Sequence, residues 1–255
     1  MNVRARINRS VVIGLLGSSL ALATPSTTYW TPAVTDIQPF GVLHLGVDNY
    51  TTVFRKADRG GGDFATDYGL TMGVLPFEKL QLEVGVDLFE PSDYPLAFNA
   101  KLGTPEGTLF TESPALNVGI FNVGTKRDVT DYDTGYVVIG KTIPLLGRVF
   151  AGGYLGSDTL VDAEGDKDNK GFMVGMDHGF CPVKDRAGDE YNRLVLAGDW
   201  ASGDNFLGGG GAGLYYYFTR NISLLTGPVF FNDSEMNGKW KWTVQLDINA
   251  PVFGQ

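Results

Sequence analysis

The feature that most constrains this chain is an unbroken alternation of apolar and polar residues over positions 79–90. The apolar residues share one parity: Leu80, Leu82, Val84, Val86 and Leu88. The other parity holds Lys79, Gln81, Glu83, Gly85 and Asp87. Successive side chains of a β-strand point to opposite faces, so this stretch predicts a strand with one apolar and one polar face. About ten such residues, tilted by about 40°, rise roughly 25 Å, which matches the apolar layer of a membrane.

The same pattern recurs along the chain and predicts twelve strands. They cover residues 40–50, 64–74, 79–90, 96–102, 115–123, 135–143, 148–155, 171–180, 193–201, 211–218, 222–231 and 239–249. The facing of the sixth and seventh stays open, because their parity is ambiguous. Long polar connections alternate with short ones, as an up-and-down barrel requires, except that 104–114 and 181–192 are too long for the short set.

Alternation alone does not say which face is buried, because a soluble secreted β-sandwich has the same period. A sandwich exposes Lys, Glu and Thr, whereas the polar parity here is rich in Gly, Asp, Asn and isolated charges, as in a crowded lumen. We therefore predict an all-β fold: an antiparallel, up-and-down transmembrane β-barrel of about twelve strands, closed by pairing of the last strand with the first.

The N-terminal residues predict a separate role. Three arginines precede an apolar run that ends in Ala21-Leu22-Ala23, a small-residue cleavage pattern, so residues 1–23 are interpreted as a signal peptide. Residues 24–36 are polar and contain proline, and we expect a periplasmic lead-in or a plug. Residues 37–255 are predicted to form the barrel.

Charge and cysteine content exclude several function classes. Of 20 basic residues three lie in the signal peptide, which leaves 17 against 29 acidic residues, so nucleic acid is not an expected partner. Cys181 is the only cysteine and has no partner for a disulfide or a thiolate metal site. We expect no cofactor, no metal site and no catalytic residues.

Over residues 37–253 the chain resembles the Gram-negative outer-membrane β-barrel superfamily in architecture, without a short motif that specifies one family. The resemblance implies export by the secretory route, location in the outer membrane, and contact with the lipid bilayer and the outer-membrane insertion machinery. Such proteins usually end on an aromatic residue, whereas here Phe253 is followed by Gly254 and Gln255.

Parity assigns individual residues to the two faces of the barrel wall. Predicted lumen or pore-lining residues are His44, Asp48, Asp67, Lys79, Glu83, Asp87, Asn99, Lys101, Lys241, Gln245 and Asp247. Predicted lipid-facing residues are Leu80, Leu82, Val84, Val86, Leu96, Trp242, Val244 and Leu246. Hairpin geometry places Glu83 opposite Lys101, Thr71 opposite Glu83, and Asp67 opposite Asp87 near the outer mouth, beside Asp48.

The function that these residues favour is a narrow channel or porin-like passage for small solutes, with an acidic outer mouth. The alternative is a structural or adhesion-type outer-membrane barrel with a closed lumen. An outer-membrane lipid hydrolase is a third interpretation. It is disfavoured because the chain has only His44 and His178 and lacks a G-x-S-x-G sequence, so no enzyme activity is expected.

Overall fold

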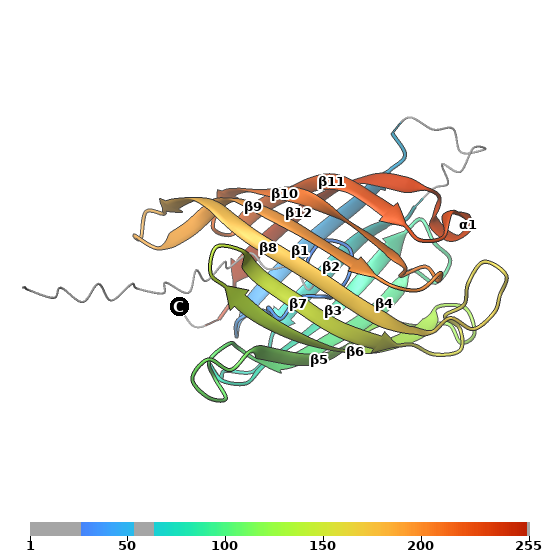
Figure 1. Cartoon of the computed structure of the whole chain (residues 1–255), viewed down its shortest axis with the longest axis horizontal. Coiled ribbons are helices and arrows are strands. Elements are labelled where there is room, and N and C mark those ends of the chain that lie inside the picture. The colour runs from blue at the N-terminus through green and yellow to red at the C-terminus, as the bar shows by residue number, and fades with distance from the viewer. Residues whose placement is uncertain (1–26, 54–63, 254–255) are drawn as a thin grey trace, which may run out of the picture.

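The computed structural model describes residues 27–53 and 64–253, and the predicted signal peptide at 1–23 lies outside this part. Twelve strands follow one another around a single closed ring (Figure 1). They are β1 (Val42–Thr51), β2 (Thr66–Gly73), β3 (Gln81–Glu90), β4 (Leu96–Thr104), β5 (Ala115–Gly124), β6 (Asp131–Ile143), β7 (Gly147–Leu155), β8 (Lys170–Lys184), β9 (Glu190–Ala201), β10 (Gly209–Thr219), β11 (Ile222–Phe231) and β12 (Trp240–Pro251). A one-turn helix, α1 (Ser234–Asn237), lies between β11 and β12.

The ring closes where β1 pairs with β12. Every strand is antiparallel to its sequence neighbours, and β1 lies between β2 and β12, with Val47 opposite Leu246 on one side and Tyr68 on the other. Closure leaves no sheet edge with unpaired backbone groups. The predicted twelve-stranded antiparallel barrel is therefore confirmed. No helix in the described part of the chain is long and apolar enough to cross a membrane.

The two faces of the wall differ in polarity as the alternation predicts. In β12, Thr243 and Gln245 face inward and are at most 1% exposed, whereas Trp242 and Val244 face outward and are each 39% exposed. Val84 of β3 also faces outward and is 42% exposed. These residues do not pack into a dry centre between two sheets, so the sandwich alternative is wrong.

Two predicted connections are shorter than expected because strands extend past the ring. β8 continues to Lys184 and β9 starts at Glu190, so that only 185–189 connect them. β6 likewise begins at Asp131, which shortens the preceding connection to 125–130. In these projecting hairpins the two strands bond to each other, and their outer backbone groups can bond to water outside the apolar layer.

The connection 105–114 is as long as the sequence indicates, and β6 holds it in place. The carboxylate of Glu106 accepts hydrogen bonds from Thr142 Oγ1 at 2.7 Å and from the Thr142 backbone N–H at 3.0 Å, and it pairs with Lys141 at 2.7 Å. Partial burial by itself would raise the pKa of Glu106, but these bonds stabilise the anion more strongly and lower that pKa.

The connections divide the barrel into two ends. We call the end that carries α1 and residues 156–169 the loop end, and the opposite end, with the connections 144–146 and 185–189, the turn end (Figure 1). The chain enters β1 at the turn end.

Candidate functional site in the filled lumen

The interior of the barrel is occupied by the chain's own residues 27–38, which we call the lumenal segment. It has no helix or strand and lies within the ring of strands (Figure 1). Tyr29 and Ala33 are completely buried, and Gln38 is 1% exposed. These residues precede the first strand, so their burial requires contact with the inward face of the wall.

The principal anchor of the segment is the carboxylate of Asp199 in β9. It accepts hydrogen bonds from the backbone N–H groups of Tyr29, Trp30 and Thr31, at 2.8–3.1 Å, and from the Thr31 hydroxyl at 3.1 Å. A carboxylate buried away from water is stable only when donors of this kind surround it. Asp199 therefore holds the first turn of the segment in one position.

Side chains from the rest of the wall hold the segment along its length. Gln245 of β12 donates to the Tyr29 carbonyl at 2.9 Å, and Asn117 of β5 donates to the Val34 carbonyl at 2.9 Å. The Gln38 backbone N–H donates to Glu83 of β3 at 2.7 Å. Inward polar residues thus satisfy the backbone groups of a segment that lacks secondary structure of its own.

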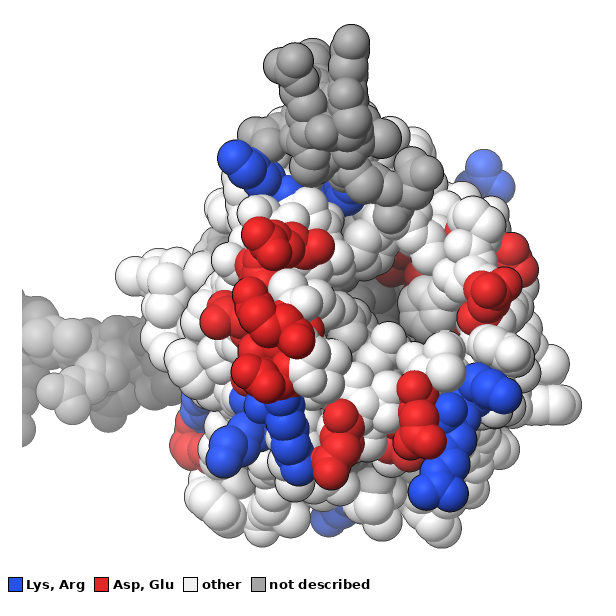
Figure 2. Space-filling model, turned by 90° about the vertical axis from the view of Figure 1, so that its right-hand side faces the viewer, with Lys and Arg blue, Asp and Glu red and all other residues white. Residues whose placement is uncertain are grey.

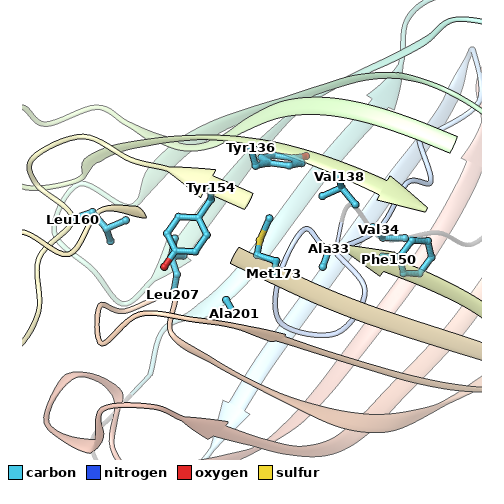
Figure 3. Close-up of a cluster of buried hydrophobic side chains, with 10 residues drawn as sticks. All are labelled: Ala33, Val34, Tyr136, Val138, Phe150, Tyr154, Leu160, Met173, Ala201 and Leu207. Carbon is cyan, nitrogen blue, oxygen red and sulfur yellow. The ribbon is translucent and has the colours of Figure 1, made fainter. Parts of the chain in front are cut away.

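An apolar cluster joins the segment to one side of the wall (Figure 3). Ala33 and Val34 of the segment belong to the same buried cluster as Val138 of β6 and Phe150 of β7. Apolar residues therefore face inward here as well as outward. This explains why the sequence leaves the facing of these two strands ambiguous.

Glycines on the inward face create room for the segment. A Cβ at Gly175 of β8 would lie 2.6 Å from the Ala33 carbonyl oxygen, and its other near neighbours, Ala33 Cβ and Thr28 Oγ1, also belong to the segment. A Cβ at Gly140 of β6 would lie 2.6 Å from Thr35 Oγ1. Glycine is needed where a backbone approaches this closely.

Two ion-pair groups lie where the segment approaches the turn end, a partly exposed one around Arg148 and a buried one around Lys101. Arg148 of β7 contacts Asp36 of the segment at 2.5 Å and Asp177 of β8 at 2.6 Å. Lys101 of β4 lies 3.4 Å from Glu83 and donates to the Asp36 carbonyl at 3.0 Å. Each of these cations lies between an acidic residue of the wall and the segment, so the pairs tie the two together.

Toward the loop end, three aspartates of neighbouring strands face the interior. Asp48 of β1 lies directly opposite Asp67 of β2, and Asp87 of β3 lies opposite Gly69 of β2. Asn99 of β4 donates to Asp87 at 2.7 Å. Like charges directly opposite one another destabilise a strand pair, so the opposition of Asp48 and Asp67 has to be offset by something else.

Two neighbouring cavities lie at this end of the barrel, and the inner one contains these aspartates. The inner pocket, about 150 Å³, is lined by Trp30, Tyr50 and Phe64 and by all three aspartates. The vestibule, about 590 Å³, lies between it and the loop end and is bounded by α1 and by residues 92–97. Phe64, Phe89 and Phe206 line both. Figure 2, which views the loop end, shows acidic side chains beside a central hollow.

Most residues that the sequence assigns to the lumen lie on the inward face. His44, Glu83, Lys101, Lys241, Gln245 and Asp247 are at most 5% exposed. Asp48, Asp67, Asp87 and Asn99 line the inner pocket. Of the residues assigned to lipid, Val84, Trp242 and Val244 are exposed on the outer wall, and Leu82, Val86, Leu96 and Leu246 are partly exposed there.

Two assignments and one register differ from the sequence prediction. Lys79 and Leu80 lie in the connection before β3 and are exposed, so Lys79 does not line the lumen and Leu80 does not belong to the strand. The β2–β3 hairpin centres on residue 78, because the Val74 N–H bonds to the Leu82 carbonyl. Glu83 is therefore opposite Gly73 instead of Thr71, and Phe89 takes the predicted place of Asp87 opposite Asp67. The predicted pairing of Glu83 with Lys101 is correct.

Sequence reasoning missed Asp199, Arg148 and Asp177 as lumen residues. Asp177 and Asp199 are single charges on the polar parity of their strands, which is the signal that identified the other lumen residues, whereas Arg148 begins a strand of ambiguous parity. Trp30 of the lumenal segment also lies inside the barrel, where its indole N–H donates to the Leu207 carbonyl at 2.9 Å.

The two histidines and the inward serine do not form a nucleophilic arrangement. Asp247 lies between Ser223, whose hydroxyl donates to it at 3.2 Å, and His44, 3.5 Å away. A nucleophilic serine needs the imidazole, not the carboxylate, in the middle position. His178 lies in β8 against Phe180, with ring centroids 4.5 Å apart.

A scan against protein-family models gave no match, and a search of curated proteins gave none either. Among solved structures the chain is similar to the NanC porin, with 8% identity over 83% of this chain and 100% of that one, at a TM-score of 0.49. An outer-membrane channel from Pseudomonas putida F1 is 11% identical over 89% and 98% of the two chains, at a TM-score of 0.42. LpxR from Salmonella typhimurium is 13% identical over 82% and 99%, at 0.39.

These likenesses are too distant to support an argument about function. What the chain itself presents is a single closed antiparallel ring with an even number of strands, an apolar outer wall and a polar interior. That is the architecture of outer-membrane β-barrels.

Proposed function

We propose that this protein is an outer-membrane channel for small solutes whose passage is closed by its own lumenal segment. The observation that carries the proposal is that residues 27–38 fill a ring that is complete without them. The apolar outer wall supports contact with the bilayer, and the insertion machinery for such barrels is the expected partner during assembly. The loop end would face outward and the turn end the periplasm.

The way in which the segment is held supports a removable closure. Its backbone bonds to side chains such as Asp199, Gln245 and Asn117, and strand pairing does not depend on it. Water entering the lumen can replace these polar contacts, at a cost set mainly by exposure of the apolar contacts that Tyr29, Trp30, Ala33 and Val34 make with the wall. Departure of the segment would therefore leave the ring of strands closed.

The alternative is a structural barrel in which the segment never leaves. The same contacts favour it, because many buried hydrogen bonds and two ion-pair groups hold the segment in place. The two functions differ in one respect: only a channel conducts when the segment is weakened.

Substitution of Gly175 by valine should weaken the closure, because the three atoms nearest to an added Cβ all belong to the lumenal segment. Overpacking of this kind costs about 1–3 kcal/mol, which corresponds to an open fraction roughly 5–150 times larger. Recordings in planar bilayers would measure this as more frequent openings at unchanged single-channel conductance.

A valine at Gly135 is the matched control for Gly175→Val. Gly135 lies in β6 with no atom nearer than 3.8 Å to an added Cβ, so its substitution should leave the open fraction unchanged. If Gly175→Val folds but its recordings stay as silent as those of the wild type, the closed structural barrel replaces the channel.

The membrane assignment predicts a separate effect on the outer wall. Val244 lies near the middle of β12 and faces outward, so Val244→Arg should destabilise the barrel in lipid vesicles by about 2–4 kcal/mol. Val129→Arg in the connection 125–130 should change stability by less than about 0.5 kcal/mol. Urea titration of tryptophan fluorescence measures both, and equal effects would contradict a lipid-facing wall.

A further inference from the structure

The opposed aspartates of β1 and β2 lack an offsetting cation among the described residues that line the inner pocket. Asp67 Oδ1 is enclosed and has no hydrogen-bond partner in the described part of the chain. Among the described basic residues, His44 lies 3.5 Å from Asp247 and Lys101 lies 3.4 Å from Glu83, so each has an acidic partner other than Asp67. An enclosed carboxylate oxygen without a donor is costly, which points to a group that binds there.

The residues that line the pocket carry a net negative charge, which also favours a bound cation. Among the residues that the structure describes, its lining includes Asp48, Asp67, Asp87 and Glu83 but only one basic residue, Lys101. Lys101 offsets Glu83, and Asn99 donates one neutral hydrogen bond to Asp87. The remaining negative charge is concentrated at Asp48 and Asp67 and attracts a cation from the vestibule.

Another part of the pocket lining is aromatic. The rings of Trp30, Tyr50 and Phe64 form a compact group, with centroid separations of 5.3 Å for Trp30 and Tyr50, 5.6 Å for Trp30 and Phe64, and 5.0 Å for Tyr50 and Phe64. Aromatic faces attract organic cations, and walls of this kind bind quaternary ammonium groups. A hydrated metal ion gains little from such a wall.

The size and access of the pocket limit the class of ligand. Its volume of about 150 Å³ is close to that of an engineered protein cavity that holds benzene, so a guest with a handful of heavy atoms fits. The vestibule of about 590 Å³ connects it with the loop end. Among the residues the structure describes, no three His, Cys, Asp or Glu side chains are grouped so as to hold a metal ion.

We propose that the inner pocket is a binding site for a small organic ammonium cation, held between the carboxylates of Asp48 and Asp67 and the rings of Trp30, Tyr50 and Phe64. The inference goes beyond the proposed channel and does not depend on it. Binding from the loop end needs only the closed barrel, whereas conduction needs the lumenal segment to leave.

Calorimetric titration of the full chain in detergent with choline chloride tests the proposal. Sodium chloride at equal ionic strength controls for general charge screening, and 3,3-dimethylbutan-1-ol is a neutral analogue of the same shape as choline. We expect saturable binding of choline, and at least about tenfold weaker binding of the neutral analogue, because it lacks the charge that meets the carboxylates. Equal heats from choline and sodium would overturn the assignment to an organic cation.

Substitutions locate the site. Asp67→Asn and Asp48→Asn should each weaken choline binding at least about tenfold, since each removes one carboxylate while keeping its shape. Glu90→Gln is the matched control, because Glu90 lies on the exposed, outward parity of β3 and should leave binding unchanged.

Both aspartate substitutions relieve like-charge repulsion, so loss of folding is not an expected complication. Choline binding that survives in both variants would place the ligand elsewhere and overturn the proposal. Absence of choline binding in the wild type would also overturn the proposal. A proton shared by Asp48 and Asp67 would then explain how the two lie opposite one another. Neither result bears on whether Gly175→Val opens the channel.

Discussion

Deletion of residues 27–38 is expected to convert silent bilayers into bilayers with steady, open-channel conductance. The wall closes through β1 and β12, whose pairing runs from Val42 to Thr51 and does not involve the deleted residues. Removal of the segment leaves inward polar groups such as Asp199 and Gln245 facing water, which hydrates them as it does in open barrels. Planar-bilayer recording at fixed voltage measures the change directly.

The deletion has an internal control in the Gly175 substitution. The atoms nearest to an added Cβ at Gly175 belong to the segment, so in the deletion background Gly175→Val should no longer change the open fraction. Circular dichroism in detergent establishes that the strands still form. A folded deletion variant without conductance would contradict the channel, because the lumen would then be closed by wall side chains alone.

The alanine variant of Asp199 is expected to release the start of the lumenal segment while leaving the rest of the chain folded. It removes the acceptor of bonds from three backbone N–H groups and one hydroxyl. A buried donor left unsatisfied costs about 1–3 kcal/mol, so the docked state of the segment is destabilised by several kcal/mol. The fraction of molecules with the segment released then rises by about a hundredfold or more. Hydrogen exchange at the amides of Tyr29, Trp30 and Thr31 should accelerate in proportion.

A comparison with Asp185 separates a local effect from a general one. Its carboxylate also accepts backbone hydrogen bonds, from Ala187 and Asp189 at 2.8 and 3.0 Å, but within a connection at the turn end. Asp185→Ala should leave exchange at residues 29–31 unchanged. Slow exchange at those amides in Asp199→Ala would mean that the apolar cluster, not the carboxylate, holds the segment.

Local pattern was sufficient for much of the wall. In β3, β4 and β12 one face is apolar and the other polar, so parity alone separates Val84 and Val244 from Glu83 and Lys101. The predicted opposition of Glu83 and Lys101 is correct because the short β3–β4 connection sets the register. The β2–β3 register was wrong by two residues, because the extent of its connection depends on backbone bonds that the pattern does not contain.

Where both faces of a strand are apolar, the pattern could not decide which face points into the barrel. Val138 and Phe150 point inward because Ala33 and Val34 lie against them, which is known only once the lumenal segment is placed. Tyr50 of β1 likewise packs against Trp30 of that segment and against Phe64 inside the barrel.

The amino-acid sequence by itself determined the number of strands, their antiparallel order and the polarity of the two faces of the wall, because these depend on neighbours two residues apart and on short hairpins. Only the tertiary structure decided what fills the ring. Contacts between residues 27–38 and β5, β8, β9 and β12 join positions up to 216 residues apart in the chain. Such contacts arise when closure brings distant strands around a common interior, and no local periodicity encodes them.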